Sequence, residues 1–185
     1  MKLLLYLIFV LFISSCEKTT SVPYQEDPKW ALANKIYDSQ IGKSVFFQLK
    51  KEKNLNVIES GWGLRGRENI RCMHCGFQYF NEITIEEARK LLMDTVNLYL
   101  KSINENEGIR PFMDNYPFGP ENIEIRIFIY NPNDPKPRAD KLRVIKIVDG
   151  ILKYMIGDEH RTTIYKESYQ EALSKLGTTL VSNER

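Results

Sequence analysis

The chain is short of the side chains that most enzymes use for chemistry. Its 185 residues include three cysteines and two histidines, His74 and His160. G-x-S-x-G, H-E-x-x-H and P-loop motifs are absent from the sequence. The acidic residues are scattered along expected helix faces, where solvated ion pairs are their usual role. The residues therefore do not favour an enzyme, although a site built from dispersed residues stays open, and they indicate no cofactor.

The chain also lacks an excess of charge of either sign. Lysine and arginine total 26, aspartate and glutamate total 24, and the formal net charge is +2. A general nucleic-acid-binding domain shows a strong basic excess. We therefore expect no nucleic acid among the partners.

No apolar run is long enough to cross a bilayer as a helix, which takes about 20 residues. The apolar residues 3–13 follow Lys2 and precede Ser14, Ser15 and Cys16. A basic start, a short apolar stretch and small residues before a cleavage point are typical of a secretory signal peptide.

The ending ISSC resembles the lipobox of bacterial lipoproteins, over residues 1–16 only. In that class a cysteine follows the cleavage point and carries diacylglyceride on its sulfur and a fatty acid on its amine. The resemblance implies a signal peptide over residues 1–15, lipid attachment at Cys16 and a place in the bacterial cell envelope, facing the periplasm. Glu17 replaces the aspartate that commonly retains such proteins in the inner membrane, which favours the outer membrane. A plain signal peptide that happens to contain a cysteine is the alternative.

The rest of the chain divides into a tether and one domain. Residues 16–27 comprise the lipidated cysteine and a polar stretch without periodicity, which is typical of a short tether. Residues 28–185 are long enough for a single domain with its own core. The expected partners are the membrane, through the lipid, and a protein or glycan of the envelope.

Three stretches carry helix signals. Asp27 and Pro28 suit the cap and first position of a helix that Gly42 is expected to end. Residues 43–53 fit either a second helix or a strand. The strongest signal is the capping box formed by Thr84 and Glu87, which opens a long apolar stripe.

The capping box predicts a helix over residues 84–104. A third helix is predicted over residues 164–176, where aromatic and aliphatic residues recur at helical spacing before Gly177.

Between these helices the apolar period changes to two. Residues 123–129 alternate isoleucine with other residues, which predicts a strand with one buried face. Asp149 and Gly150 predict a two-residue hairpin turn, whose strands place Lys146 and Lys153 on the face away from the isoleucines.

Two more strands are predicted near residues 55–60 and 70–80. Hairpins that alternate with helices indicate the α+β class. We expect a single antiparallel sheet of about five strands with about three helices packed on one face.

Residues 61–66 read GWGLRG, a literal match to G-x-G-x-x-G. In a dinucleotide site these glycines end a strand and open a helix, but no helical stripe follows here. A glycine-rich connection between two strands is the preferred interpretation. Trp62, Arg65 and Arg67 are candidate binding residues for an anionic lipid headgroup or a glycan, and a solvated loop is the alternative.

The segment 108–122 places Phe112, Tyr116 and Phe118 among three prolines. Proline stiffens a loop, and aromatic rings offer contact area at low entropic cost. Tyr116 and Phe118 are therefore candidate residues of a partner-binding loop. The alternative, which we favour, is that the rings close one end of the core.

Residues 71–77 read RCMHCGF. Cys72 and Cys75 have the spacing of a redox pair, and with His74 and the distant His160 they offer the ligand types of a zinc site. The apolar alternation around them favours a strand instead. In a strand, residues three apart lie about 10 Å apart on opposite faces, too far for a disulfide. We expect a lipid-anchored binding or scaffolding domain with no metal, and a thiol redox protein or a metal-binding domain are the alternatives.

Overall fold

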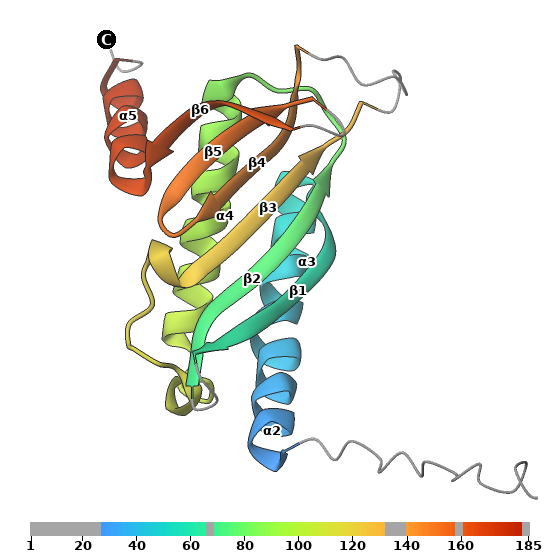
Figure 1. The fold of residues 1–185 in the computed structure, drawn as a ribbon, viewed down its shortest axis with the longest axis vertical. Coiled ribbons are helices and arrows are strands. Elements are labelled where there is room, and N and C mark those ends of the chain that lie inside the picture. The colour runs from blue at the N-terminus through green and yellow to red at the C-terminus, as the bar shows by residue number, and fades with distance from the viewer. Residues whose placement is uncertain (1–26, 66–68, 132–139, 158–160, 183–185) are drawn as a thin grey trace, which may run out of the picture.

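The protein folds as a six-stranded sheet with helices on one of its faces (Figure 1). The computed structural model describes residues 27–65, 69–131, 140–157 and 161–182. The helices are α2 (Pro28–Ile36), which continues through the π-helical turn η1 (Tyr37–Gly42) into α3 (Lys43–Lys53), then α4 (Ile85–Glu105) and α5 (Tyr169–Ser182). None of these described helices is long and apolar enough to cross a bilayer.

The strands follow one another across the sheet in the order of the sequence. They are β1 (Asn56–Arg65), β2 (Asn69–Tyr79), β3 (Ile123–Ile129), β4 (Leu142–Val148), β5 (Ile151–Ile156) and β6 (Thr162–Ser168). Neighbours are antiparallel except β2 and β3, which α4 connects and which run parallel.

The α+β class is confirmed, and the predicted sheet is corrected from about five antiparallel strands to six strands of mixed direction. A parallel pair needs a long crossover, and α4 supplies it. The sixth strand, β6, includes residues 164–168, which had been predicted as the start of the third helix. Because β6 runs into α5 without a break, the apolar residues of both were read as one helical stripe.

The first helix does not end at Gly42, which is buried inside a continuous helix. Asp27 caps this helix as predicted, since its Oδ1 accepts a hydrogen bond from the Lys29 N–H at 2.9 Å. Residues four apart drift by about 40° around an α-helix, and the wider π turn takes up part of that drift. The buried residues spaced four apart are Ala33, Tyr37, Ile41, Val45 and Leu49.

Two of the predicted turns and caps are confirmed. Thr84 Oγ1 accepts from the Glu87 N–H at 3.2 Å, and Glu87 Oε2 accepts from the Thr84 N–H at 2.8 Å. Asp149 and Gly150 have φ values of 51° and 72°, the left-handed pair that a tight hairpin turn requires.

The core lies between the sheet and the helices and draws on described residues from Ala33 to Ala172. A chain that begins after Cys16 therefore keeps every one of these core residues. Inside the core, the hydroxyls of Tyr37 and Tyr99 lie 2.7 Å apart, and Tyr37 also donates to the His74 carbonyl at 3.3 Å. These bonds satisfy buried polar groups and join the first helix, α4 and β2.

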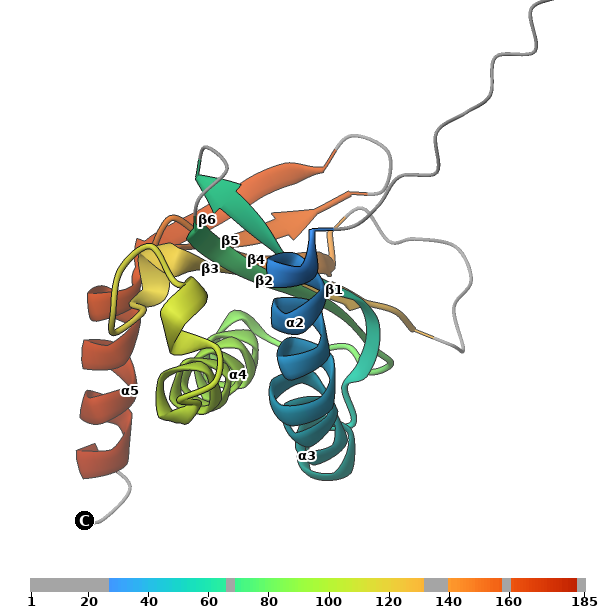
Figure 2. The ribbon, with the colours of Figure 1, turned by 90° about the horizontal axis from the view of Figure 1, so that it is seen from below.

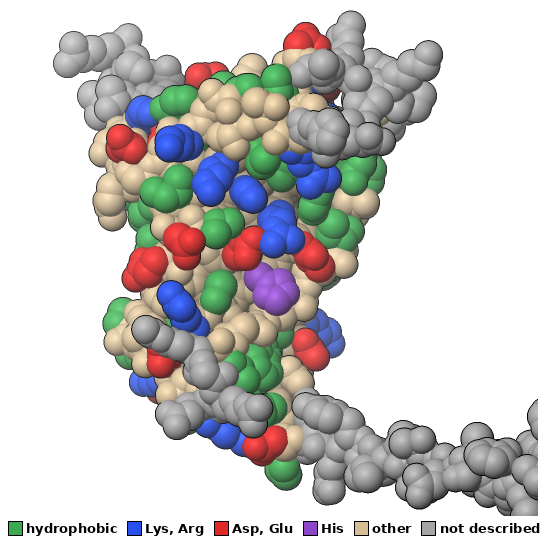
Figure 3. Space-filling model, viewed as in Figure 1, with side chains coloured by type: hydrophobic (Ala, Val, Ile, Leu, Met, Phe, Trp, Pro, Cys, Tyr) green, Lys and Arg blue, Asp and Glu red, His purple; other side chains and the backbone are tan. Residues whose placement is uncertain are grey.

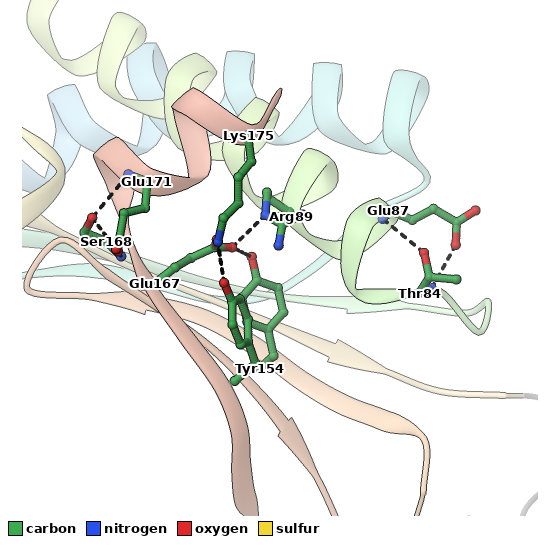
Figure 4. A network of polar contacts seen from close by, with 9 residues as sticks. Thr84, Glu87, Arg89, Tyr154, Glu167, Ser168, Glu171 and Lys175 are labelled. Carbon is green, nitrogen blue, oxygen red and sulfur yellow. Dashed lines mark hydrogen bonds and ion pairs between the residues drawn. The ribbon is translucent and has the colours of Figure 1, made fainter. Parts of the chain in front are cut away.

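A buried ionic network joins α5 to the sheet and to α4 (Figure 4). Glu167 is 4% exposed. Its Oε1 accepts from Arg89 Nε at 2.7 Å and from the Tyr154 hydroxyl at 2.6 Å, and its Oε2 accepts from Lys175 Nζ at 2.7 Å. Burial alone raises the pKa of Glu167, but these donors outweigh it and the pKa lies below its usual value. The carboxylate is therefore held ionised.

Glu167→Gln should lower the free energy of unfolding by about 3–5 kcal/mol, because it leaves Arg89 buried without its anionic partner. Urea denaturation at neutral pH measures this. Since the pKa of Glu167 is lowered in the folded state, its contribution is present above the ordinary value of 4.5 and is lost as the pH falls through the folded value.

The matched control is Glu105→Gln, which removes an exposed carboxylate paired with Lys101 at 3.9 Å. It should change stability by about 0.5 kcal/mol or less. Equal losses for both variants would contradict a dominant role for the buried network.

Candidate functional site

The described helices all lie on one side of the sheet, and no described helix or strand covers the other face, which we call the open face (Figure 2). In Figure 3, which looks onto that face, basic side chains form a band across the sheet with acidic side chains beside it. The residues of this band and its surroundings come from β1 to β6, and they are the candidate functional site.

Two glycines shape the β1–β2 end of the open face. A Cβ on Gly61 would lie 3.0 Å from the ring of His74, and one on Gly76 would lie 2.5 Å from the Glu59 side chain. Each glycine thus makes room for a side chain of the neighbouring strand. The prediction that GWGLRG connects two strands is wrong for residues 61–65, because they belong to β1 and pair with β2 inside the sheet.

Arg126 on β3 lies between two carboxylates of this end. Its Nη2 contacts Glu124 Oε1 at 2.5 Å, and its Nη1 lies 3.5 Å from Glu59 Oε1. The guanidinium is 42% exposed, so the pairs are partly screened by water. The charges here largely neutralise one another.

The band across the remaining strands consists of lysines in register. Arg126 is directly opposite Lys146, Lys146 is opposite Lys153, and Lys153 is opposite Lys166. Like charges directly opposite each other in a sheet are destabilising. Lys146, Lys153 and Lys166 form no ion pair with any other described residue. We call these three residues the lysine row.

A small pocket adjoins the lysine row. Its lining includes Phe128, Tyr130, Arg143 and Arg161, and its volume is about 90 Å³. Arg161 lies over the Phe128 ring at 5.3 Å and Arg143 over the Tyr130 ring at 5.5 Å. Pockets for drug-sized ligands hold about 300 Å³ or more. This pocket is too small for such a ligand, and its guanidinium groups add to the positive charge of the open face.

Of the predicted binding residues around GWGLRG, Trp62 does not belong to this surface. Trp62 pairs with Met73 on the helix side of the sheet, and its ring lies 5.1 Å from that of Trp30. It is therefore part of the packing between the first helix and β1. Arg67 and the side chain of Arg65 lie outside the described residues.

The two candidate residues of the predicted partner-binding loop differ in burial. Phe118 is 3% exposed, and its backbone N–H and carbonyl both bond the side chain of Asn104, at 2.8 and 3.0 Å. It closes the end of the core, as the favoured alternative stated. Tyr116 is half-exposed, with Arg110 over its ring at 4.3 Å. The structure brings neither ring to the open face.

The strand predicted through RCMHCGF is confirmed as β2. Cys72 is half-buried on the open face, Cys75 is buried on the helix side, and both thiols are free. Burial raises the pKa of both thiols, and the carboxylates of Glu124 and Asp149 raise that of Cys72 further. Both thiols therefore stay largely protonated at neutral pH and are weak nucleophiles.

The proposed zinc ligands are not brought together. His74 shares a face with Cys72, but Cys75 lies across the sheet from them, and His160 lies outside the described residues. Within the described ranges, no group of three or more His, Cys, Asp or Glu side chains has the arrangement of a metal site.

Comparison of the chain with models of protein families, with curated proteins and with solved structures found no match. Sequence analysis placed Lys146 and Lys153 on the face away from the core but did not make them site residues. Lys166 was not recognised, because it was predicted to lie in a helix. The lysine row becomes visible only once β6 is paired with β5.

Iodoacetamide should modify Cys72 slowly in the native protein and leave Cys75 untouched, because both thiols have raised pKa values and Cys75 is buried. Unfolding in urea should expose both to full modification, as read by peptide mass spectrometry. A mapped Cys72–Cys75 bridge in oxidised protein would contradict the strand geometry.

Lys153→Glu should raise the free energy of unfolding by about 0.5–1 kcal/mol at low salt, because two like-charge pairs become opposite-charge pairs. The gain should shrink at high salt, where exposed charges are screened, and this salt dependence is the control. Denaturant titration at two ionic strengths measures both. A loss of stability would show that the lysine row supports the fold.

Proposed function

We propose that the protein is a lipid-anchored binding domain of the bacterial envelope that uses the open face of its sheet. The lysine row carries the binding role, because its charges are in direct cross-strand register and lack a described partner. Such an arrangement weakens the fold, and stability is commonly sacrificed where function requires it.

An uncovered face is by itself ordinary, since antiparallel sheets often have one solvated side. A surface that serves only solubility intersperses charges of both signs. The β4–β6 part of this face instead presents Lys146, Lys153 and Lys166 side by side. A partner of opposite charge would relieve their mutual repulsion, and this supports binding as the role of the face.

The buried titratable groups support the fold in this proposal. Glu167 is bonded by Arg89, Tyr154 and Lys175, so its carboxylate has no free oxygen to offer a substrate. The hydroxyls of Tyr37 and Tyr99 satisfy each other inside the core. Neither group faces the small pocket beside the lysine row. A binding role without chemistry fits these contacts best.

The anchor in this proposal is the acylated Cys16. Its support is the apolar stretch of residues 3–13 followed by Ser14, Ser15 and Cys16. Acyl chains on sulfur and amine together would hold the chain stably at the membrane, where one chain would not. Glu17 favours the outer membrane in this proposal.

Expressed from its full sequence in a bacterium, the protein should fractionate with membranes and yield an N-terminal peptide that begins at Cys16 with a diacylglyceryl thioether and an amide-linked fatty acid. Intact-mass and peptide mass spectrometry read this directly. Cys16→Ser is the variant, and Cys72→Ser is the matched control that should leave acylation unchanged. A mature chain that begins at another residue would refute the anchor.

A further inference from the structure

We infer that the β4–β6 part of the open face binds the anionic phospholipid headgroups of a membrane surface. This inference rests on the proposed binding role of the open face and names its ligand. It assigns direct contact between folded domain and lipid, in addition to the acyl anchor.

The charge of the lysine row fits phosphate groups arranged on a surface. Adjacent strands lie about 4.8 Å apart, so Lys146, Lys153 and Lys166 span about 10 Å across three strands. Arg161, which flanks the pocket beside Phe128, extends the positive charge on this side. Basic side chains near an anionic bilayer each add to its attraction.

The apolar residues beside the lysines favour a membrane surface over a dissolved polyanion as the ligand. Ile164 is 46% exposed and lies two positions from Lys166 along β6. Ile151 and Met155 are partly exposed and pair with Val148 and Val144 on the open face. Interfacial binding combines buried apolar area with attraction to anionic lipid, whereas a dissolved polyanion makes no use of the apolar part.

The acidic residues of the same face include a pair whose charges Arg126 offsets. Glu59 and Glu124 come from β1 and β3, and both contact Arg126. Strands in a sheet rotate by about 20–25° from one neighbour to the next, and Figure 2 shows this twist. The β1 end is therefore turned away from a flat surface that contacts β4–β6, which reduces the repulsion from Glu59, and the contact with Arg126 offsets the charge of Glu124.

The proposed tether is long enough for this contact. Eleven residues, 17–27, separate Cys16 from Pro28, and such a stretch reaches at most about 36–40 Å. That reach is comparable to the length of the first helix, roughly 40 Å at 1.5 Å per residue. The domain can therefore turn its open face to the bilayer that holds its lipid.

The test uses a chain that begins at Glu17, which carries no acyl group and keeps all the described core residues. Sedimentation with vesicles of phosphatidylcholine, alone or mixed with phosphatidylglycerol, measures binding. We expect binding to the anionic vesicles only, weakening with salt. The triple variant Lys146→Gln, Lys153→Gln, Lys166→Gln should bind about a hundredfold more weakly, at about fivefold for each lysine.

The matched control is Lys35→Gln, Lys43→Gln, Lys51→Gln, which removes the same charge from exposed positions on the first helix. It should bind as the parent chain does. Ile164→Gln should weaken binding to anionic vesicles and leave any binding to inorganic polyphosphate unchanged. Thermal melting of each variant confirms that it is folded, and a variant that has unfolded is replaced by the single change Lys153→Gln.

The inference is overturned if the parent chain ignores anionic vesicles, or if the control variant loses as much binding as the row variant. It is also overturned if polyphosphate binds as tightly as vesicles and Ile164→Gln has no effect, because the ligand is then a dissolved polyanion. In that last case the binding role of the open face survives. Loss of vesicle binding together with normal acylation of Cys16 separates this failure from failure of the anchor.

Discussion

The crossover through α4 determines which face of this sheet can meet a ligand. β2 and β3 are adjacent and parallel, so the chain must pass over one face between them. The apolar stripe of α4 then fixes that face as the core, and the first helix and α5 pack on the same side. All other pairs of neighbouring strands in the described sheet are antiparallel. The open face is a result of this one connection.

The two faces depend on each other through β6. Neighbouring residues of this strand point to opposite sides, so Lys166 lies on the open face while Glu167 enters the buried network with Arg89 and Lys175. The ion pair inside holds an edge strand that would otherwise be secured on one side only. The end of the lysine row is therefore positioned by an ionic network on the opposite side of β6, in which Glu167 is buried.

The local features of the fold could be predicted from sequence, because short-range chemistry sets them. The capping box of Thr84 and Glu87 and the Asp149–Gly150 turn are examples, and the alternation through Cys72 and Cys75 gave the faces of β2. The parallel pairing of β2 with β3 could not be read, since it depends on how distant elements pack.

The start of α5 was misread for a related reason. Tyr165 and Tyr169 lie four apart, a helical spacing, although the first belongs to β6 and the second to α5. This error affected the candidate site most. Lys166 belongs to the lysine row only because β6 pairs with β5, where Lys166 is opposite Lys153. Trp62 and Phe118 were judged by residue type, and packing placed both away from the open face.

The π turn at Tyr37–Gly42 accommodates one residue more than a regular α-helix would over the same rotation. If the turn became α-helical without losing a residue, everything before it would rotate by about 100°. Ala33 would then leave the core, and its polar neighbour Asn34 would take its place. A related chain could therefore lack one residue between Ala33 and Leu49 and still bury the same positions on an unbroken α-helix.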